Sequence, residues 1–375
     1  MTRRFWGLTR RQTVGVVAGA AVVGIAIGFI LGPSGGDSDR ATRAAPTVER
    51  VKPGSAGSAD AVWVFGFETL RFDARLEGAQ QLGVRGFGSV QGDAGRVFMY
   101  DPATGRVGSL DARRNTLSVV GHLPPGTAEP DAFLPSIARY GATLWLVSDP
   151  GMLTPLDLGT SQVGQPVALV SPPTAATLDH RATGVVAGPG GVFAATRAPG
   201  GIEVARIDPA TGTVAVAGVI DGSETAPSLG GIAVDAARLW VLSGSVLYTF
   251  DPATLEIVRT DEVEERSSGS ARGLVAAGGD AWMLTDNGAT LTRLRTTTGG
   301  LDPVLRILRP VPDELRMPAS LVAADDRVFA MVRRREDPED LTVRVVGFDT
   351  AREVPTRGID VPGEIAPGAL AASWR

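Results

Sequence analysis

The chain has 375 residues, a hydrophobic content of 43%, 48 glycines, 26 prolines and no cysteine. The lack of cysteine excludes disulfides, thiolate chemistry, iron–sulfur clusters and lipobox acylation. A formal net charge of −5 provides no global basic field, so nucleic acid is not an expected partner. Lys52 is the one lysine among 36 basic residues, which is typical of GC-rich, actinobacterial coding rather than of a binding site.

The N-terminal residues predict a single membrane span. Arg3, Arg4, Arg10 and Arg11 precede Thr13–Gly32, a stretch without any charged residue. At a rise of about 1.5 Å per residue, a helix of this length matches the roughly 30 Å hydrocarbon core of a bilayer. The arginines keep their side of the span in the cytoplasm, so the chain after Gly32 is predicted to lie outside the cell membrane.

A cleaved export signal is the alternative to an anchor. The stretch TRRQTV at 9–14 resembles a twin-arginine signal, but the aromatic residue that should follow is missing and no clear A-x-A cleavage site is present. The prediction is therefore a cytoplasmic N-terminus at 1–12, a retained anchor at 13–32 and a flexible tether at 33–59, rich in Gly, Ser, Pro and Ala. The globular part is predicted at 60–375.

Seven aromatic residues recur along the globular part, each inside a short apolar run such as ATLWLV or DAWML. Their intervals range from 35 residues (63 to 98) to 48 residues (145 to 193). Eight positions before six of them lies an aliphatic residue that follows Ser or Gly, and this constant offset predicts a repeated pair of strands. The aromatics are Trp63, Phe98, Trp145, Phe193, Trp240, Trp282 and Phe329, and the aliphatics are Val90, Ile137, Val185, Ile232, Leu274 and Leu321.

An apolar residue followed by Asp forms a third column. Asp favours a turn because its carboxylate accepts hydrogen bonds from the backbone N–H groups ahead of it. The turn sequences DPATG at 208–212 and DPATL at 251–255 belong to this column, whereas DPATG at 101–105 is predicted to turn one hairpin earlier. Leu294-Arg295 is the one departure. The column consists of Phe72-Asp73, Leu110-Asp111, Leu156-Asp157, Ile207-Asp208, Phe250-Asp251 and Phe348-Asp349.

Each unit of the repeat predicts four antiparallel strands, a to d, which form one blade of a β-propeller. The predicted fold class is therefore all-β, with seven blades whose interfaces are filled by the aromatics. Six or eight blades stay possible because the first interval is short. The C-terminal GALAASWR repeats the strand-a pattern at Leu370, while the globular part begins with strand b at Ala61. These ends are predicted to complete one shared blade and close the ring.

The unit GGIAVDAARLWVLSGSVLYTFDPATLEIV at 230–258 and its counterpart at 184–215 resemble the YVTN, NHL and streptogramin-lyase-like group of bacterial β-propellers. The resemblance covers roughly 61–375 and rests on turn and packing residues, so it implies a fold more than a function. Members similar to virginiamycin B lyase use a histidine at the propeller mouth with a carboxylate and a divalent metal. The resemblance implies such a role here only for His180, with Asp131 or Glu364 as carboxylate.

The two histidines of the chain are interpreted differently. His122 ends a predicted strand d and is expected to be a structural or surface residue, whereas His180 lies in a d-to-a loop that opens on the channel mouth. The sequence contains no H-x-E metal pair, no D-x-D-x-D-G calcium loop and no G-x-S-x-G nucleophile elbow. We therefore predict no catalytic residue, no metal site and no cofactor.

A basic rim is the first candidate binding site. In a propeller the d-to-a and b-to-c loops share one face, where they surround the channel. Residues just before strand a are therefore expected to converge on the channel mouth and to hold an anionic group through charge-assisted hydrogen bonds, unless they are solvated arginines scattered by composition. These residues are Arg85, His180, Arg181, Arg272 and Arg316.

The second candidate is the stretch RRREDPED at 333–340, which lengthens the b-to-c hairpin of the last blade. It is predicted to be either a solvated tip or a knob that docks a partner through Arg333, Arg334, Arg335, Glu336 and Asp337. Together these features predict a single-pass membrane protein whose extracytoplasmic propeller binds or scaffolds a protein or glycan partner. A streptogramin-lyase-like or hydrolase-like enzyme and a propeller secreted after signal cleavage are the alternatives.

Overall fold

A computed structural model of the chain describes residues 49–50, 60–65, 69–82, 89–101, 104–125, 134–149, 151–169, 182–198, 200–221, 228–263, 271–285, 290–307, 316–337, 340–356, 358–361 and 369–374. Met1–Ala44 and Ala45–Arg375 form separate units, and every described residue belongs to the second. In these ranges no helix is long and apolar enough to cross a membrane. The predicted anchor at 13–32 lies outside them.

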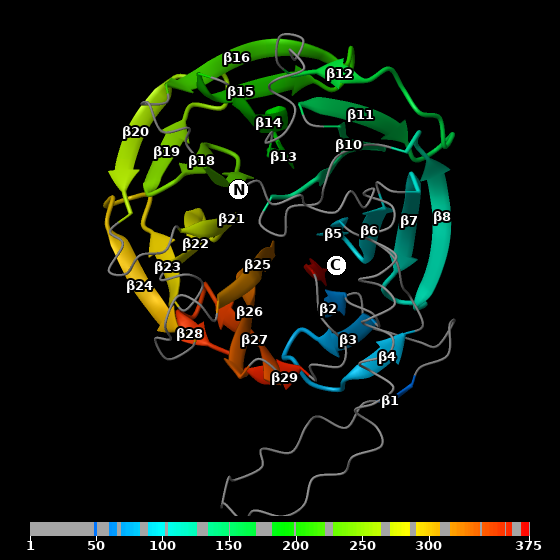
Figure 1. Cartoon of the computed structure of the whole chain (residues 1–375), viewed down its shortest axis with the longest axis vertical. Helices are drawn as coiled ribbons and strands as arrows, with labels where there is room; N and C mark the ends of the chain where they lie inside the picture. Colours follow the sequence, from blue (N-terminus) through cyan, green and yellow to red (C-terminus); the bar gives the residue numbers. More distant parts are fainter. Residues whose placement is uncertain are drawn as a thin grey trace, which may run out of the picture. The chain divides into compact units, whose positions relative to one another are not determined.

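The described strands form seven sheets that follow one another around a ring (Figure 1). The innermost strands, in ring order, are β30 (Ala369–Ser373), β5 (Ser89–Asp93), β9 (Ile137–Tyr140), β13 (Thr183–Gly188), β17 (Leu229–Val234), β21 (Arg272–Ala277) and β25 (Arg316–Ala324). The second strands are β2 (Ala61–Phe65), β6 (Arg96–Asp101), β10 (Thr143–Asp149), β14 (Gly191–Ala198), β18 (Leu239–Ser243), β22 (Asp280–Thr285) and β26 (Arg327–Asp337).

The outer half of each blade is less regular. The third strands are β3 (Thr69–Asp73), β7 (Arg106–Asp111), β11 (Met152–Asp157), β15 (Gly201–Asp208), β19 (Val246–Phe250), β23 (Thr290–Leu294) and β27 (Asp340–Asp349). The outer strands are β4 (Gln80–Leu82), β8 (Thr116–His122), β12 (Val167–Ala168), β16 (Thr213–Asp221), β20 (Ile257–Glu262), β24 (Leu301–Arg306) and β28 (Val354–Pro355). Two short strands add to blade edges: β29 (Ile359–Val361) pairs with β27, and β1 (Glu49–Arg50) pairs with β4.

The ring is closed through its innermost strands. Each of them contacts the innermost strands of the two neighbouring blades, including β30 with β5 on one side and with β25 on the other. The seven-bladed prediction is therefore confirmed, and the short first interval of 35 residues does not remove a blade. All seven column aromatics are fully buried between blades.

The constant offset of eight residues reflects one pairing register. In each blade the inner aliphatic lies opposite the residue that follows the column aromatic, as Ile232 lies opposite Val241. The glycine before Ile232 has a steric cause. A Cβ on Gly231 would lie 2.5 Å from Cβ of Leu274 in the next blade, so the close approach of these two inner strands requires glycine at this position.

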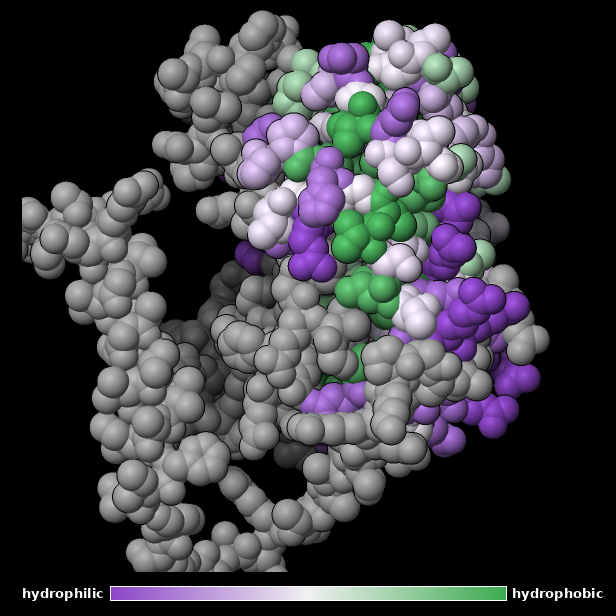
Figure 2. Space-filling view, turned by 90° about the vertical axis from the view of Figure 1, so that its right-hand side faces the viewer, coloured by the Kyte–Doolittle hydropathy of each residue, from purple (hydrophilic) through white to green (hydrophobic). Residues whose placement is uncertain are grey.

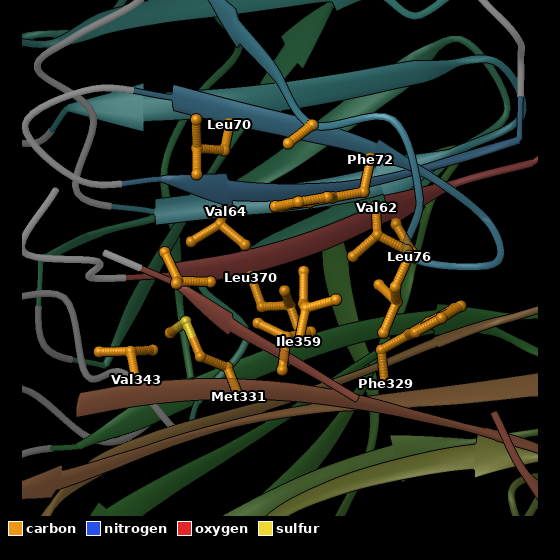
Figure 3. Packing of buried hydrophobic residues seen from close by; sticks show 14 of the residues in the cluster. Val62, Val64, Leu70, Phe72, Leu76, Phe329, Met331, Val343, Ile359 and Leu370 are labelled. Carbon is orange, nitrogen blue, oxygen red and sulfur yellow. The ribbon is translucent and has the colours of Figure 1, made fainter. Parts of the chain in front are cut away.

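The closing blade joins the two ends of the globular part. Strand β30 pairs antiparallel with β2, with Leu370 opposite Val64, and the Trp63 indole N–H donates to Ser373 Oγ at 3.3 Å. Leu370 is 1% exposed and lies between the side chains of β2 and those of the last blade, including Met331 and Ile359 (Figure 3). The predicted closure is confirmed.

The Asp column caps the turns between third and outer strands. Asp157 Oδ1 accepts from the backbone N–H groups of Gly159 and Thr160 at 2.9 and 2.7 Å, and Asp208 Oδ1 accepts from that of Ala210 at 2.8 Å. The hydrogen bonds from Thr160 hold the pKa of Asp157 below its ordinary value, and the backbone hydrogen bond from Ala210 does the same for the pKa of Asp208. As predicted, the DPATG at 101–105 instead joins β6 to β7.

Arg295, the one departure from the Asp column, has a substitute on a neighbouring strand. Asp280 Oδ1 accepts from the backbone N–H of Thr296 at 2.9 Å, so the turn keeps a carboxylate cap although its own position carries Arg. The Arg295 side chain pairs with Asp302 on β24. This turn is therefore built with the same chemistry from different residues.

Candidate functional site

The predicted rim is described only in part. Arg272 is the first residue of β21 and its side chain is exposed, and Arg316 is the first residue of β25, opposite Arg334. Both therefore begin inner strands at the predicted end of the ring. The remaining members, Arg85, His180 and Arg181, lie outside the described residues, as do Asp131 and Glu364. The convergence of the five stays a prediction.

His122 ends the outer strand β8, as predicted, and is exposed opposite Arg106. It lies on the outer edge of its blade rather than on an innermost strand. Within the described ranges no group of three His, Asp or Glu side chains is arranged to hold a metal ion.

The centre of the ring contains a channel with a volume of about 380 Å³. Every blade contributes to its wall, for example through Ser89–Gly92 of β5 and Ser320–Ala323 of β25. Consecutive residues line it because the inner strands present their unpaired edges to the centre, so peptide groups as well as side chains form the wall. Ser136 Oγ donates to Ser89 Oγ at 2.5 Å near one end, and Trp374 lines the channel near the other.

None of the described residues that line the channel has a charged side chain. Their hydrogen-bonding groups are peptide N–H and C=O groups, three serines, Gln91 and the Trp374 indole. A wall of this kind suits water or a neutral polar molecule, because an ion would lose its hydration without gaining an opposite charge. Acid–base chemistry would therefore need groups from the loops at the mouth.

A second cavity of about 320 Å³ lies at the seam of the ring, where the first and last blades meet, on the side of the a-to-b and c-to-d turns. Asp60, Asp325, Asp326 and Asp349 line it together with Trp374. Asp60 is distant in sequence from Asp325, Asp326 and Asp349, and it meets them only because the first and last blades close on each other. Sequence reasoning missed the cavity for that reason.

The hairpin formed by β26 and β27 is the most extended part of the ring. Strand β26 continues for eight residues beyond Phe329, to Asp337, whereas β18 continues for three beyond Trp240, to Ser243. Five more residues at about 3.3 Å each extend the hairpin by roughly 16 Å. The lengthened hairpin at 333–340 is therefore confirmed, while its side chains lie outside the description.

The base of this extension is hydrogen-bonded on both edges, whereas beyond Arg334 and before Val343 the described strands pair only with each other. On one side β25 reaches Arg334 through Arg316, and on the other β29 pairs with β27, with Val343 opposite Val361. A four-stranded sheet is stiffer than an isolated hairpin, which is marginally stable in water. The hairpin therefore stands on a laterally paired base, and its outer part is a two-stranded ladder of β26 and β27.

No family model matches the chain, and no curated protein matches it. Solved structures do. A 6-phosphogluconolactonase candidate from Bacteroides uniformis is 12% identical with a TM-score of 0.59, covering 84% of this chain and 99% of its own. Apo AztD from Citrobacter koseri is 12% identical with a TM-score of 0.55, covering 84% and 97%. The computationally designed Ika8 protein is 13% identical with a TM-score of 0.51, covering 84% and 90%.

At these identities the similarity shows the β-propeller fold alone. The narrower resemblance to the YVTN, NHL and streptogramin-lyase-like group stays a prediction. What the neighbours bind or convert does not transfer to this chain, because function on a propeller resides in loops that differ between proteins.

Proposed function

We propose that the chain is a membrane-anchored, extracytoplasmic propeller that binds a partner protein through the face on which the β26–β27 hairpin stands. The extended β26–β27 hairpin, whose base is hydrogen-bonded to β25 on one edge and to β29 on the other, is the observation that carries this proposal. Rigid scaffolds that present protruding elements are suited to recognition, because little conformational entropy is lost on binding.

The charge pattern of the hairpin favours a protein partner. Its shaft carries three consecutive arginines, Arg333–Arg335, and its tip carries acidic residues from Glu336 to Asp340. A surface with both signs close together matches a protein surface of mixed charge better than a uniformly anionic glycan. Contacts between charged side chains at the edge of a protein–protein interface set the association rate and the specificity, and these contacts weaken as the salt concentration rises.

The anchor is tested by membrane fractionation. Because Thr13–Gly32 is apolar and long enough to span a bilayer, the full chain should stay with membranes after an alkaline carbonate wash. Protease added outside the cell should digest the propeller. Recovery of the protein from the medium, with a new N-terminus near 33–45, would contradict the anchor and leave the secreted alternative.

The docking face is tested by photo-crosslinking in the native membrane. A photoreactive amino acid at Glu336 should give one dominant crosslinked product, since this position lies at the hairpin tip. The matched control is Thr211, an exposed turn residue on the opposite face of the ring. Equal yields of the same product from both positions, or no product from Glu336, would contradict the proposal.

A further inference from the structure

Among the described outer strands, β16 has the longest run without charge or proline. It has nine residues, and Thr213–Ile220 reads TVAVAGVI. An outer strand exposes a row of N–H and C=O groups that can pair with another chain. Proteins protect such edges with charged residues, proline, short strands or an added covering segment.

The other outer edges show these protections. Strand β4 is covered by β1, and β12 and β28 have two residues each. Strand β20 carries an ion pair between Arg259 and Asp261, and β24 contains Pro303. In the described part of the ring, β16 pairs with β15 only.

Strand β8 is the nearest rival. The side of the ring that carries it has a narrow band of hydrophobic residues between hydrophilic ones (Figure 2), and Val119 is 50% exposed. A bulge at Val120 interrupts β8, however, and leaves four residues, Thr116–Val119, in continuous register with β7. Strand β16 has a bulge as well, at Ala215, but its continuous run is longer: Val216–Asp221 pairs with β15 without a break, and its first five residues are uncharged.

The two faces of β16 differ in how far their side chains are buried. Val216 and Ile220 pack against the core shared with the next blade, whereas Ala217 and Val219 on the other face are exposed. Val219 is 54% exposed, although it is an aliphatic residue in the middle of a regular ladder. A contiguous apolar edge of this kind is typical of an association surface.

We propose that β16 pairs antiparallel with β16 of a second copy, around a two-fold axis at Gly218. In this register Val216 lies opposite Ile220 of the second copy, and Ala217 lies opposite its Val219. Residues opposite each other in an antiparallel ladder share a face, so both exposed positions meet apolar partners and both packed positions remain on the packed side. The two blades then form one continuous sheet of eight strands.

The sequence of the edge favours a second copy over another occupant. The pairs from Val216 to Ile220 contain no charge, and the same strand supplies both halves of each pair, as a two-fold interface requires. Asp221 comes at the end of this ladder, opposite the bulged Ala215 of the second copy. The outer strands lie on the circumference of the ring (Figure 1), so two rings can meet at one blade each. One shared strand edge is a small interface, and the association is expected to be weak and reversible.

Disulfide crosslinking of the full chain tests the register, because the natural chain contains no cysteine. Paired residues in an antiparallel ladder have Cα atoms about 4.5–5.5 Å apart, within the range that a disulfide bridges. A variant with both Ala217→Cys and Val219→Cys, in detergent micelles, should therefore form covalent dimers under mild oxidation. The matched control carries Thr260→Cys and Glu262→Cys, exposed positions with the same spacing on the continuous part of β20.

The β16 variant should form at least about ten times more dimer than the control, which corresponds to a preference of about 1.4 kcal/mol. The single substitution Val219→Lys in the natural chain should abolish the self-association that sedimentation measures. The melting temperature should not change, because Val219 is exposed. A β16 variant that stays monomeric, that dimerises no more than the control, or that crosslinks to a different protein instead would overturn the proposal. Self-association that survives Val219→Lys would overturn it as well.

Discussion

Leu370→Ala tests whether the ring is held by its C-terminal strand. The substitution removes three carbons from a side chain that is 1% exposed at the seam between the first and last blades. The transfer contribution alone is about 2.4 kcal/mol at about 0.8 kcal/mol per carbon, and the cavity left behind adds to it. We expect the free energy of unfolding to fall by about 3 kcal/mol.

The assay is thermal and denaturant unfolding of the purified chain. For the 331 residues of the unit Ala45–Arg375, an unfolding entropy of about 2.1 cal/mol/K per residue gives about 0.7 kcal/mol/K, so 3 kcal/mol lowers the melting temperature by about 4 °C. Leu274→Ala is the matched control, because Leu274 occupies the same column away from the seam and is 4% exposed. Val258→Ala, at a position 59% exposed, should change stability by less than about 0.5 kcal/mol.

Equal losses for Leu370→Ala and Leu274→Ala would show that the C-terminal strand packs as tightly as an internal inner strand. A loss below about 1 kcal/mol for Leu370→Ala, beside a full loss for Leu274→Ala, would refute closure through β30.

Three further predictions concern packing and ionisation. Gly231→Ala should lower the free energy of unfolding by about 1–3 kcal/mol in denaturant titrations, because its Cβ would lie 2.5 Å from that of Leu274; an unchanged midpoint would show that the inner strands can separate. Asp208→Asn should reduce the loss of stability on acidification, measured by melting between pH 5 and 2, because a depressed folded-state pKa stabilises the fold above the unfolded-state pKa and that contribution disappears as pH falls. Burial, and then Asp149 and Asp101, raise the pKa of Tyr100 to about 12, so its contribution to stability should be complete below pH 10 and lost as pH rises through 12; a spectrophotometric titration in which all tyrosines ionise near pH 10 would contradict this.

The repeat was predictable because its columns are local. The distance from Ile232 to Trp240 depends only on one hairpin, so the same register recurs in each blade and shows directly in the sequence. Leu370 was assigned to the column from the same pattern, although its partner strand lies at the other end of the globular part. Short-range spacing thus predicted a long-range pairing.

Other features depend on contacts that no periodicity encodes. The parallel pairing of Glu49 with Gln80 involves two residues outside the repeat, and the acidic seam cavity arises only when Asp60 and Asp349 are brought together by closure. The channel was expected to present a charged mouth, but its wall was not predictable because strand edges, rather than particular side chains, form it. For the basic rim, the sequence identified Arg272 and Arg316 as residues that begin inner strands. Their convergence on the channel mouth stays a prediction.

The hydrogen bond between Trp63 and Ser373 spans 310 positions of sequence, which has a consequence for the order of folding. A chain made from its N-terminus completes β2 long before β30 exists, so the inner edge of β2 has no partner until Ala369–Ser373 has been made. Closing a loop of this length costs about 1.7 kcal/mol more chain entropy than a contact about 45 residues apart, which delays this step relative to pairing within and between neighbouring blades. Until β30 pairs with it, the inner edge of β2 is an unpaired strand edge, which is the kind of edge at which misassembly begins.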